Sequence, residues 1–300
     1  NMCVSHYAKY MPFIFALTAS FFFALSTFLS KLIGTGILSD AVHPLQVTHS
    51  RFAFGFVATS SFYLIFGKQK IRRPNLRLHI LRATFGWIGV SIMFTSVVHI
   101  PITDAVALIF MNPIFAMIFA IFILKEKIGR YRWLAAVVAF GGATILVRPD
   151  GNQINFISLF CLIGAAAFGL EIVLIKLLSG KEHPLQILIF SNAIGTCLAS
   201  VPMFYLAILP SPLQLFLLVS VGCSMLIGQL LFLLAMQKTD ASVIAPLIYF
   251  TVVFVTTLDI LFLKVYPDIW SYYGATLILV AGLFIGVRES QQLRRSSEMQ

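Results

Sequence analysis

The chain has 300 residues, of which 59% are apolar and 11% charged, and its formal net charge is +10. A soluble domain usually has about 25% charged residues, so a water-soluble fold is excluded and the expected solvent is a lipid bilayer. The positive charge does not indicate nucleic acid, because the basic residues lie in short runs between long apolar stretches, a pattern that orients membrane proteins.

Ten apolar stretches are each long enough, at about 20 residues, to cross a bilayer as a helix. They cover residues 11–31, 45–66, 78–99, 104–124, 132–148, 156–176, 185–208, 214–236, 242–263 and 270–287. The connections are short, so no soluble domain is expected. The first stretch is interpreted as a retained helix because another span follows it. We therefore predict an all-α integral membrane protein with ten transmembrane helices.

Lysine and arginine are distributed unevenly between the two sides of such a protein. With the N-terminus in the cytoplasm, sixteen of the 21 basic residues fall on the cytoplasmic side. Only Lys31, Arg148 and Lys264 fall on the other side, while Arg51 and Arg82 lie within spans. Cytoplasmic loops carry this excess in membrane proteins. We predict a multi-pass protein of a bacterial cytoplasmic (inner) membrane with both termini in the cytoplasm.

Four short motifs of the first half return in the same order in the second half, each at the corresponding end of a span. The pairs are His43-Pro44-Leu45-Gln46 with His183-Pro184-Leu185-Gln186, Thr103-Asp104-Ala105 with Thr239-Asp240-Ala241, Lys31-Leu32 with Lys176-Leu177, and Val147-Arg148 with Val287-Arg288. They predict a duplicated five-helix unit, residues 1–150 and 151–300. Because five is odd, the second copy enters the membrane from the opposite side. Inverted repeats are typical of secondary transporters, whose substrate site lies near midplane between the halves.

The sequence resembles the drug/metabolite transporter superfamily, and specifically a tandem pair of EamA-type repeats. The motifs that carry the resemblance are Arg82-Ala83-Thr84-Phe85-Gly86, Pro101-Ile102-Thr103-Asp104-Ala105, Asn112-Pro113-Ile114-Phe115, Leu124-Lys125-Glu126, Arg132-Trp133, Gly141-Gly142, Val147-Arg148-Pro149, Ala245-Pro246-Leu247-Ile248-Tyr249, Tyr266-Pro267-Asp268, Tyr273-Gly274-Ala275 and Ala281-Gly282. The acid that ends the fourth span in this family is present as Glu126, whereas its second-half counterpart is Val265.

The resemblance implies a central cavity between the halves and transport by alternating access. It also implies a small polar or amphipathic substrate, such as an amino acid, a nucleoside-like metabolite or a drug. The first half is similar to bacterial members that include S-adenosylmethionine importers, so this metabolite is one candidate.

Charged residues inside a bilayer are costly and are therefore candidates for function. Arg51 is interpreted as a substrate-binding residue, with snorkelling to the headgroups as the alternative. Glu171 lies in an apolar segment, where a carboxyl group must be neutral, paired or in contact with water. It is a candidate for binding a cationic group or a coupling proton, and a structural pair with Lys176 or Arg82 is the alternative.

Three further residues are candidates for gating or for ion pairs. Arg82 is expected to snorkel on the cytoplasmic side or to pair with an acid. His49 lies near Arg51 within the same span. Asp259, near the outer end of the ninth span, has a pair with Lys264 or exposure at the rim as its alternatives.

Two prolines interrupt predicted spans at roughly corresponding places. Asn112-Pro113 in the fourth span and Pro246 in the ninth each remove one backbone hydrogen bond. Broken helices at midplane are where transporters bind substrates, and a packing kink is the alternative. The remaining side chains expected to line the cavity are Trp87, Asn192, Gln229 and Tyr249.

The sequence has no motif for enzymatic chemistry. Its six histidines are scattered, and it contains no HExxH, GxSxG or Walker loop. No metal or cofactor is expected, and the four cysteines are interpreted as packing residues. We predict a secondary active transporter, not an enzyme, with a small-molecule substrate, a proton as candidate coupling ion, membrane lipid around it and no nucleic-acid partner. It is expected to be a monomer or homodimer, and the alternatives are a passive channel or receptor and a membrane-embedded enzyme.

Overall fold

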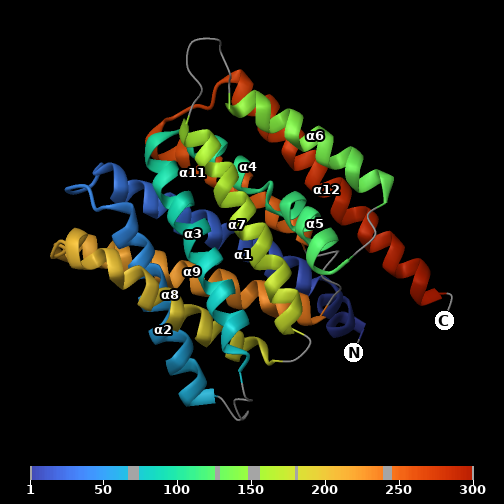
Figure 1. Cartoon of the computed structure of the whole chain (residues 1–300), viewed down its shortest axis with the longest axis horizontal. Helices are drawn as coiled ribbons and strands as arrows, with labels where there is room; N and C mark the ends of the chain where they lie inside the picture. Colours follow the sequence, from blue (N-terminus) through green and yellow to red (C-terminus); the bar gives the residue numbers. More distant parts are fainter. Residues whose placement is uncertain are drawn as a thin grey trace.

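The computed structural model describes residues 2–66, 74–125, 129–147, 156–179, 182–238 and 245–298, and every regular element in these ranges is helical (Figure 1). The elements are α1 (Met2–Thr35), α2 (Pro44–Phe66), α3 (Leu76–His99), α4 (Ile102–Ile109), α5 (Asn112–Ile123), α6 (Arg130–Val147), α7 (Phe156–Ser179), α8 (Pro184–Leu206), α9 (Pro212–Lys238), η1 (Ala245–Tyr249), α11 (Phe250–Leu258), η2 (Asp259–Leu263) and α12 (Ile269–Glu298). The predicted boundary at residues 150 and 151 lies outside these ranges and stays a prediction.

The helices fill the ten predicted spans. Six have both the length and the composition of a membrane-crossing helix, and three shorter apolar helices cover Trp133–Leu146, Leu247–Leu263 and Ile269–Phe284. With α2 they account for all ten positions, which confirms the all-α fold class. Many large apolar side chains face outward, such as Phe122 at 75% and Phe204 at 86% exposure. In water this surface would drive aggregation, whereas lipid solvates it.

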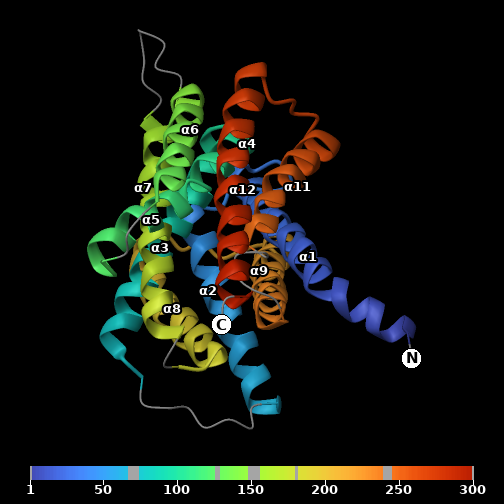
Figure 2. The same cartoon turned by 90° about the vertical axis from the view of Figure 1, so that its right-hand side faces the viewer.

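Helices of the two halves pack on each other in reciprocal pairs. α1 packs along α9, and its second-half counterpart α7 packs along α3. α2 packs on α8, and α6 lies beside α12 in both views (Figures 1 and 2). A two-fold relation between inverted halves produces this reciprocity. Both chain ends lie in the lower half of Figure 2, opposite the turn between α11 and α12, as an even number of spans requires.

The repeated motifs produce the same local structure in both halves. His43 Nδ1 accepts a hydrogen bond from the Leu45 N–H at 3.2 Å, and His183 Nδ1 accepts one from the Leu185 N–H at 3.3 Å. Each histidine thus caps the helix that follows it. The fourth and ninth spans each end on a lysine whose backbone is in the left-handed region. These residues are Lys125, at φ 55°, and its counterpart Lys264, at φ 53°. The Thr239–Ala241 motif, Arg148 and Glu126 lie outside the described residues.

The fourth span is divided in two rather than kinked. α4 ends at Ile109, a turn follows, and α5 carries Pro113 in its first turn, where the missing N–H of proline costs no hydrogen bond. In the ninth span, Pro246 lies in the 3₁₀ turn η1, which precedes α11 and the π-helical turn η2. The rings of Phe110 and Tyr249 are 5.2 Å apart, so the two interruptions lie next to each other.

The contact between α6 and α12 depends on glycine. A Cβ added at Gly142 would lie 2.7 Å from the carbonyl oxygen of Gly274, whereas a Cβ at Gly141 would meet no atom within 4 Å. Backbone cannot move aside as a side-chain tip can, so the two neighbouring glycines differ sharply in what they tolerate.

We predict that Gly142→Ala lowers the free energy of unfolding by about 1–3 kcal/mol, because it overpacks the helix contact. Gly141→Ala is the matched control, and it should leave stability unchanged or raise it by up to about 1 kcal/mol through helix propensity. Thermal unfolding in detergent measures both. Equal effects of the two substitutions would show that α6 and α12 do not approach as closely as described.

Candidate functional site

Arg51, Arg82 and Glu171, three of the charged residues expected within spans, come together between the two halves of the chain. Nη2 of Arg82 on α3 lies 3.4 Å from Oε1 of Glu171 on α7. Nη1 of Arg82 donates to the carbonyl of Ile187 on α8 at 3.3 Å. Arg51 on α2 lies within electrostatic range of both charged groups. Of the partners that the sequence left open for Glu171, the structure therefore places Arg82 against it.

Both arginines of this cluster are enclosed by protein. Arg51 is 7% exposed and Arg82 is 6% exposed, so neither side chain extends to the headgroups and the snorkelling alternative is wrong for both. The guanidinium carbon of Arg51 lies 4.4 Å from the centroid of the Phe52 ring, in a cation–π contact. Such a contact stabilises a cation without using its N–H donors.

Two glycines leave room for the polar side chains. A Cβ at Gly86 on α3 would lie 3.0 Å from the carboxyl atoms of Glu171. A Cβ at Gly55 on α2 would lie 3.1 Å from Oδ1 of Asn192 on α8. Any larger side chain at either glycine would therefore displace a polar group of the cluster.

Several buried donors on these helices have no hydrogen-bond partner among the described residues. They are Nε and Nη1 of Arg51, Nε of Arg82, Nε1 of Trp87 and Nδ2 of Asn192. An unpaired buried donor costs about 1–3 kcal/mol. The hydroxyls of Ser91 and Ser96 on α3 have no such partner either, but the charges decide the matter, because the cluster has two cations for one acid. This chemistry suits an anionic group with several acceptors, such as a carboxylate, which arginine binds through two parallel hydrogen bonds.

The charges of Arg82 and Glu171 are found at the contact of α3 with α7 but not at the equivalent contact of α1 with α9. The contact of α1 with α9 repeats that of α7 with α3, and there Ser26 takes the place of Glu171 and donates to the carbonyl of Val221 at 3.1 Å. Leu218 occupies the position in α9 that Arg82 occupies in α3, and it is buried in an apolar cluster. The duplicated fold therefore forms without these charges, which indicates that they serve another purpose than folding.

Other predicted site residues lie on α2, α5 and α9. His49 Nε2 on α2 lies 3.1 Å from the hydroxyl of Ser200 on α8. Asn112 and Pro113 begin α5, which approaches α7 so closely that a Cβ at Gly169 would lie 2.9 Å from the Asn112 carbonyl. Gln229 is half-buried on α9.

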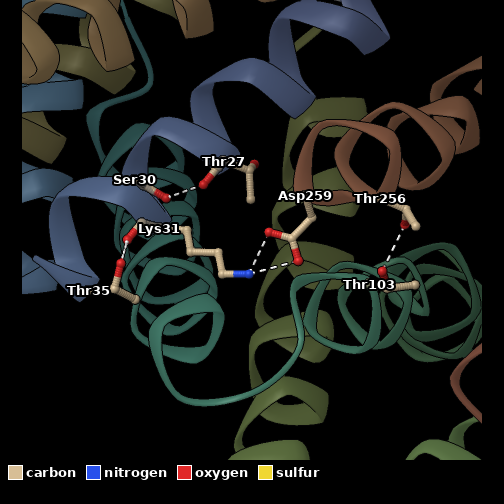
Figure 3. Close-up of polar contacts among 7 residues, drawn as sticks. All are labelled: Thr27, Ser30, Lys31, Thr35, Thr103, Thr256 and Asp259. Atoms are coloured by element: carbon tan, nitrogen blue, oxygen red, sulfur yellow. Dashed lines mark hydrogen bonds and ion pairs between the residues drawn. The ribbon is translucent and has the colours of Figure 1, made fainter. Parts of the chain in front are cut away.

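Two of the predicted site residues, Tyr249 and Asp259, contact other residues than Arg51, Arg82 and Glu171. Tyr249 is buried against Gly282 of α12, where a Cβ would collide with its ring, so it packs the broken helix rather than the arginine cluster. Asp259 forms an ion pair with Lys31 of α1, with Nζ to Oδ1 at 2.6 Å (Figure 3). Both alternatives that the sequence left open for Asp259, a pair with Lys264 and exposure at the rim, are therefore wrong.

Sequence reasoning missed a group of polar side chains around the carboxylate of Glu182, next to the start of α3. Glu182, in the connection before α8, accepts a hydrogen bond from the Asn75 N–H at 2.9 Å and one from Gln186 Nε2 at 2.7 Å. Nε2 of the buried His79 lies 2.7 Å from the same carboxylate. Glu182 stands directly before the repeated His-Pro-Leu-Gln motif, where the first half has Val42. That difference between repeats was the available signal.

The carboxyl group of Glu182 is held charged by these contacts. Burial alone would raise the pKa of Glu182, but the hydrogen bonds from Asn75, His79 and Gln186 outweigh it and lower the pKa below its ordinary value. At the equivalent junction of the other half, Gln214 Nε2 donates to the Asp40 carbonyl at 2.8 Å. One junction is therefore ionic, whereas the other is an amide contact.

A known protein family matches each half of the chain separately. The model of the EamA-like transporter family matches residues 11–148 and again residues 155–287. A crystal structure of a protein with 17% sequence identity matches with a TM-score of 0.62, over 96% of this chain and 99% of the other, which supports the fold.

Curated relatives are transporters of different small molecules. The S-adenosylmethionine uptake transporter of Rickettsia prowazekii is 28% identical over 92% of each chain. The riboflavin transporter of Rhizobium johnstonii is 26% identical over 82% of each chain. The pseudopaline exporter CntI of Pseudomonas aeruginosa is 28% identical over 89% of this chain and 93% of its own. These matches confirm the prediction of a multi-pass membrane transporter of small metabolites rather than an enzyme.

We predict that Glu182→Gln destabilises the protein in a pH-dependent way. Because the folded-state pKa of Glu182 is lowered from 4.5, its contribution is present above pH 4.5 and is lost as pH falls through the folded-state pKa. At pH 7 the variant should lose about 1–3 kcal/mol, since hydrogen-bond donors to a buried carboxylate are left mismatched. Thermal unfolding of both proteins between pH 7 and acid measures the difference.

The control is Asp40→Asn, which removes an exposed carboxyl group at the equivalent junction and should have little effect. A stability difference between wild type and Glu182→Gln that stays constant down to acid pH would contradict the ionic junction.

Proposed function

The chain belongs to the EamA-like transporter family, and from this we propose that it is a secondary active transporter that moves a small zwitterionic metabolite by alternating access. S-Adenosylmethionine is the first candidate, with other amino-acid-like or nucleoside-like metabolites as substrates of the same class. The observation that carries the proposal is the buried cluster of Arg51, Arg82 and Glu171, with its unpaired donors, between the two halves.

In the proposed site, different residues bind the negative and the positive groups of the substrate. A substrate carboxylate binds between Arg51 and Arg82, whose Nε atoms are buried donors without partners among the described residues. Glu171 then binds a cationic group, which is an ammonium or sulfonium group in S-adenosylmethionine. The purine ring stacks on Trp87 and Phe168, the partly buried aromatic side chains that pack against the apolar cluster containing Phe52.

Substrate binding also provides a way to couple transport to protons. In the described conformation Glu171 is paired with Arg82. A substrate carboxylate that engages Arg82 competes with Glu171 for the guanidinium group. An acid that loses its partner in a buried place must take up a cation or a proton. Glu171 is therefore the proposed coupling group, because a substrate carboxylate on Arg82 breaks the pair between Arg82 and Glu171.

We further propose that the protein lies in a bacterial cytoplasmic membrane with both termini in the cytoplasm. The excess of lysine and arginine in the connections assigned to that side supports this orientation. The connection after α2 and the start of α3 are then cytoplasmic, and the Lys31–Asp259 pair lies towards the outer face.

The test is uptake of labelled S-adenosylmethionine into proteoliposomes. Arg51→Lys should raise KM by about tenfold or more, because a point charge does not reproduce a bidentate contact. Glu171→Gln, which keeps the shape and removes the charge, should abolish accumulation driven by a pH gradient. If the variant still exchanges substrate for substrate, Glu171 couples protons. If exchange falls as well, it binds the substrate cation.

The matched control is Ser26→Ala, which alters the counterpart of Glu171 at the uncharged interface and should leave transport intact. Unchanged affinity in Arg51→Ala would contradict the proposed site. Uptake that only equilibrates and never accumulates would favour a passive channel over a secondary transporter.

A further inference from the structure

A second buried ion pair joins the two halves of the chain through α1 and η2, rather than through α3 and α7 as Arg82 and Glu171 do. Nζ of Lys31, near the end of α1, donates to both carboxylate oxygens of Asp259 at 2.6 and 2.8 Å. Figure 3 shows the lysine side chain leaving α1 and reaching across to the first residue of η2. The two side chains are 10% and 3% exposed, so both charges have been taken out of solvent.

The duplicated fold does not require this pair. Lys31 corresponds to Lys176 of α7 in the repeated Lys-Leu motif. Asp259 stands five residues before Lys264, and the residue five before the equivalent lysine, Lys125, is Ala120. The second half thus has a lysine, Lys176, at the position of Lys31. The first half has no acid at the position of Asp259, where Ala120 stands. Because burying two charges is costly even when they are paired, the pair calls for a reason other than stability.

The backbone around Asp259 is irregular. α11 changes at Asp259 into the π-helical turn η2, and the chain then enters the left-handed region at Lys264. One α-helical turn before Asp259, the hydroxyl of Thr256 lies 2.8 Å from that of Thr103, at the start of α4 (Figure 3). π-turns inside helices are frequent at functional sites. This end of the ninth span is thus held by one ionic and one neutral contact across the halves.

We propose that the Lys31–Asp259 pair is a lock that closes one end of the transporter and separates once in each transport cycle. This inference rests on transport by alternating access, in which the halves move apart at one end at a time. When that end opens, water enters and hydrates both charges, which offsets the lost ion pair. When it closes, the two charges again have only each other. An ion pair therefore fixes one arrangement of the closed end and can still separate when water enters. An apolar contact has no such gain from hydration when it separates.

The test measures the width of this end directly and needs no substrate. Spin labels are attached to Ile37→Cys and Tyr266→Cys, two exposed positions in the connections after α1 and η2, with the four natural cysteines replaced by alanine. The distance distribution is recorded in lipid nanodiscs. Asp259→Asn should raise the ratio of long to short distances by about tenfold, because it removes one charge of a buried pair and biases a two-state equilibrium.

Two double variants distinguish an effect of the ion pair from misfolding of the protein. Lys31→Met/Asp259→Leu leaves no lone charge, and it should show the short distance alone because apolar side chains do not gain from hydration. The charge swap Lys31→Asp/Asp259→Lys should return the distribution towards that of the parent protein. Lys264→Gln is the matched control, since it removes an exposed charge at the same end and should change nothing.

Unchanged distances in Asp259→Asn, or the same widening in Lys264→Gln, would overturn the proposal. Failure to transport S-adenosylmethionine would overturn the proposed substrate and leave this result unaffected, because the distances are measured without it.

Discussion

A charge that is buried within a lipid-embedded protein has to find its partner inside the protein, and the arrangement of this chain depends on that constraint. Lipid offers no hydrogen bonds and little dielectric screening, so an unpaired ion there is far more costly than in water. The described residues meet the constraint at two places in the spans. Arg82 pairs with Glu171, and Lys31 pairs with Asp259. Each pair joins a helix of the first half to an element of the second, so both ion pairs lie between the halves.

The scaffold is nearly symmetric, whereas its charges are not. Ser26 and Leu218 occupy the places at the α1–α9 interface that Glu171 and Arg82 occupy at the α7–α3 interface. Gln214 bonds to a backbone carbonyl where the other half uses the carboxylate of Glu182. The two copies of the duplicated fold therefore differ in their charged contacts, although their helices pack in the same way.

Much of the fold was predictable from the sequence, because it follows from local signals. Span length and apolar content locate the helices, and the repeated His-Pro-Leu-Gln motif predicts both the duplication and the caps at His43 and His183. The division of the fourth span at Pro113 follows from the missing N–H of proline. These features need only residues that are close together in the chain.

The partners within the site were not predictable in the same way. Lys31 and Asp259 are 228 residues apart in the chain, and Lys264, close to Asp259 in sequence, was the more obvious partner. The register of packed helices decides such pairs, and that register depends on glycines such as Gly86, whose role is evident only when Glu171 is seen against it. The sequence singles out Arg51, Arg82, Glu171 and Asp259 as charges within spans, whereas it gives no reason to single out Lys31. The partners of these charges required the three-dimensional arrangement.

The most direct test of this account is a cryo-electron microscopy structure of the protein in nanodiscs with S-adenosylmethionine bound. The account predicts one bound molecule at the α3–α7 interface, with its carboxylate within hydrogen-bond distance of the guanidinium groups of Arg51 and Arg82 and with Glu171 released from Arg82. A molecule bound at the uncharged α1–α9 interface, or one that contacts neither arginine, would contradict it.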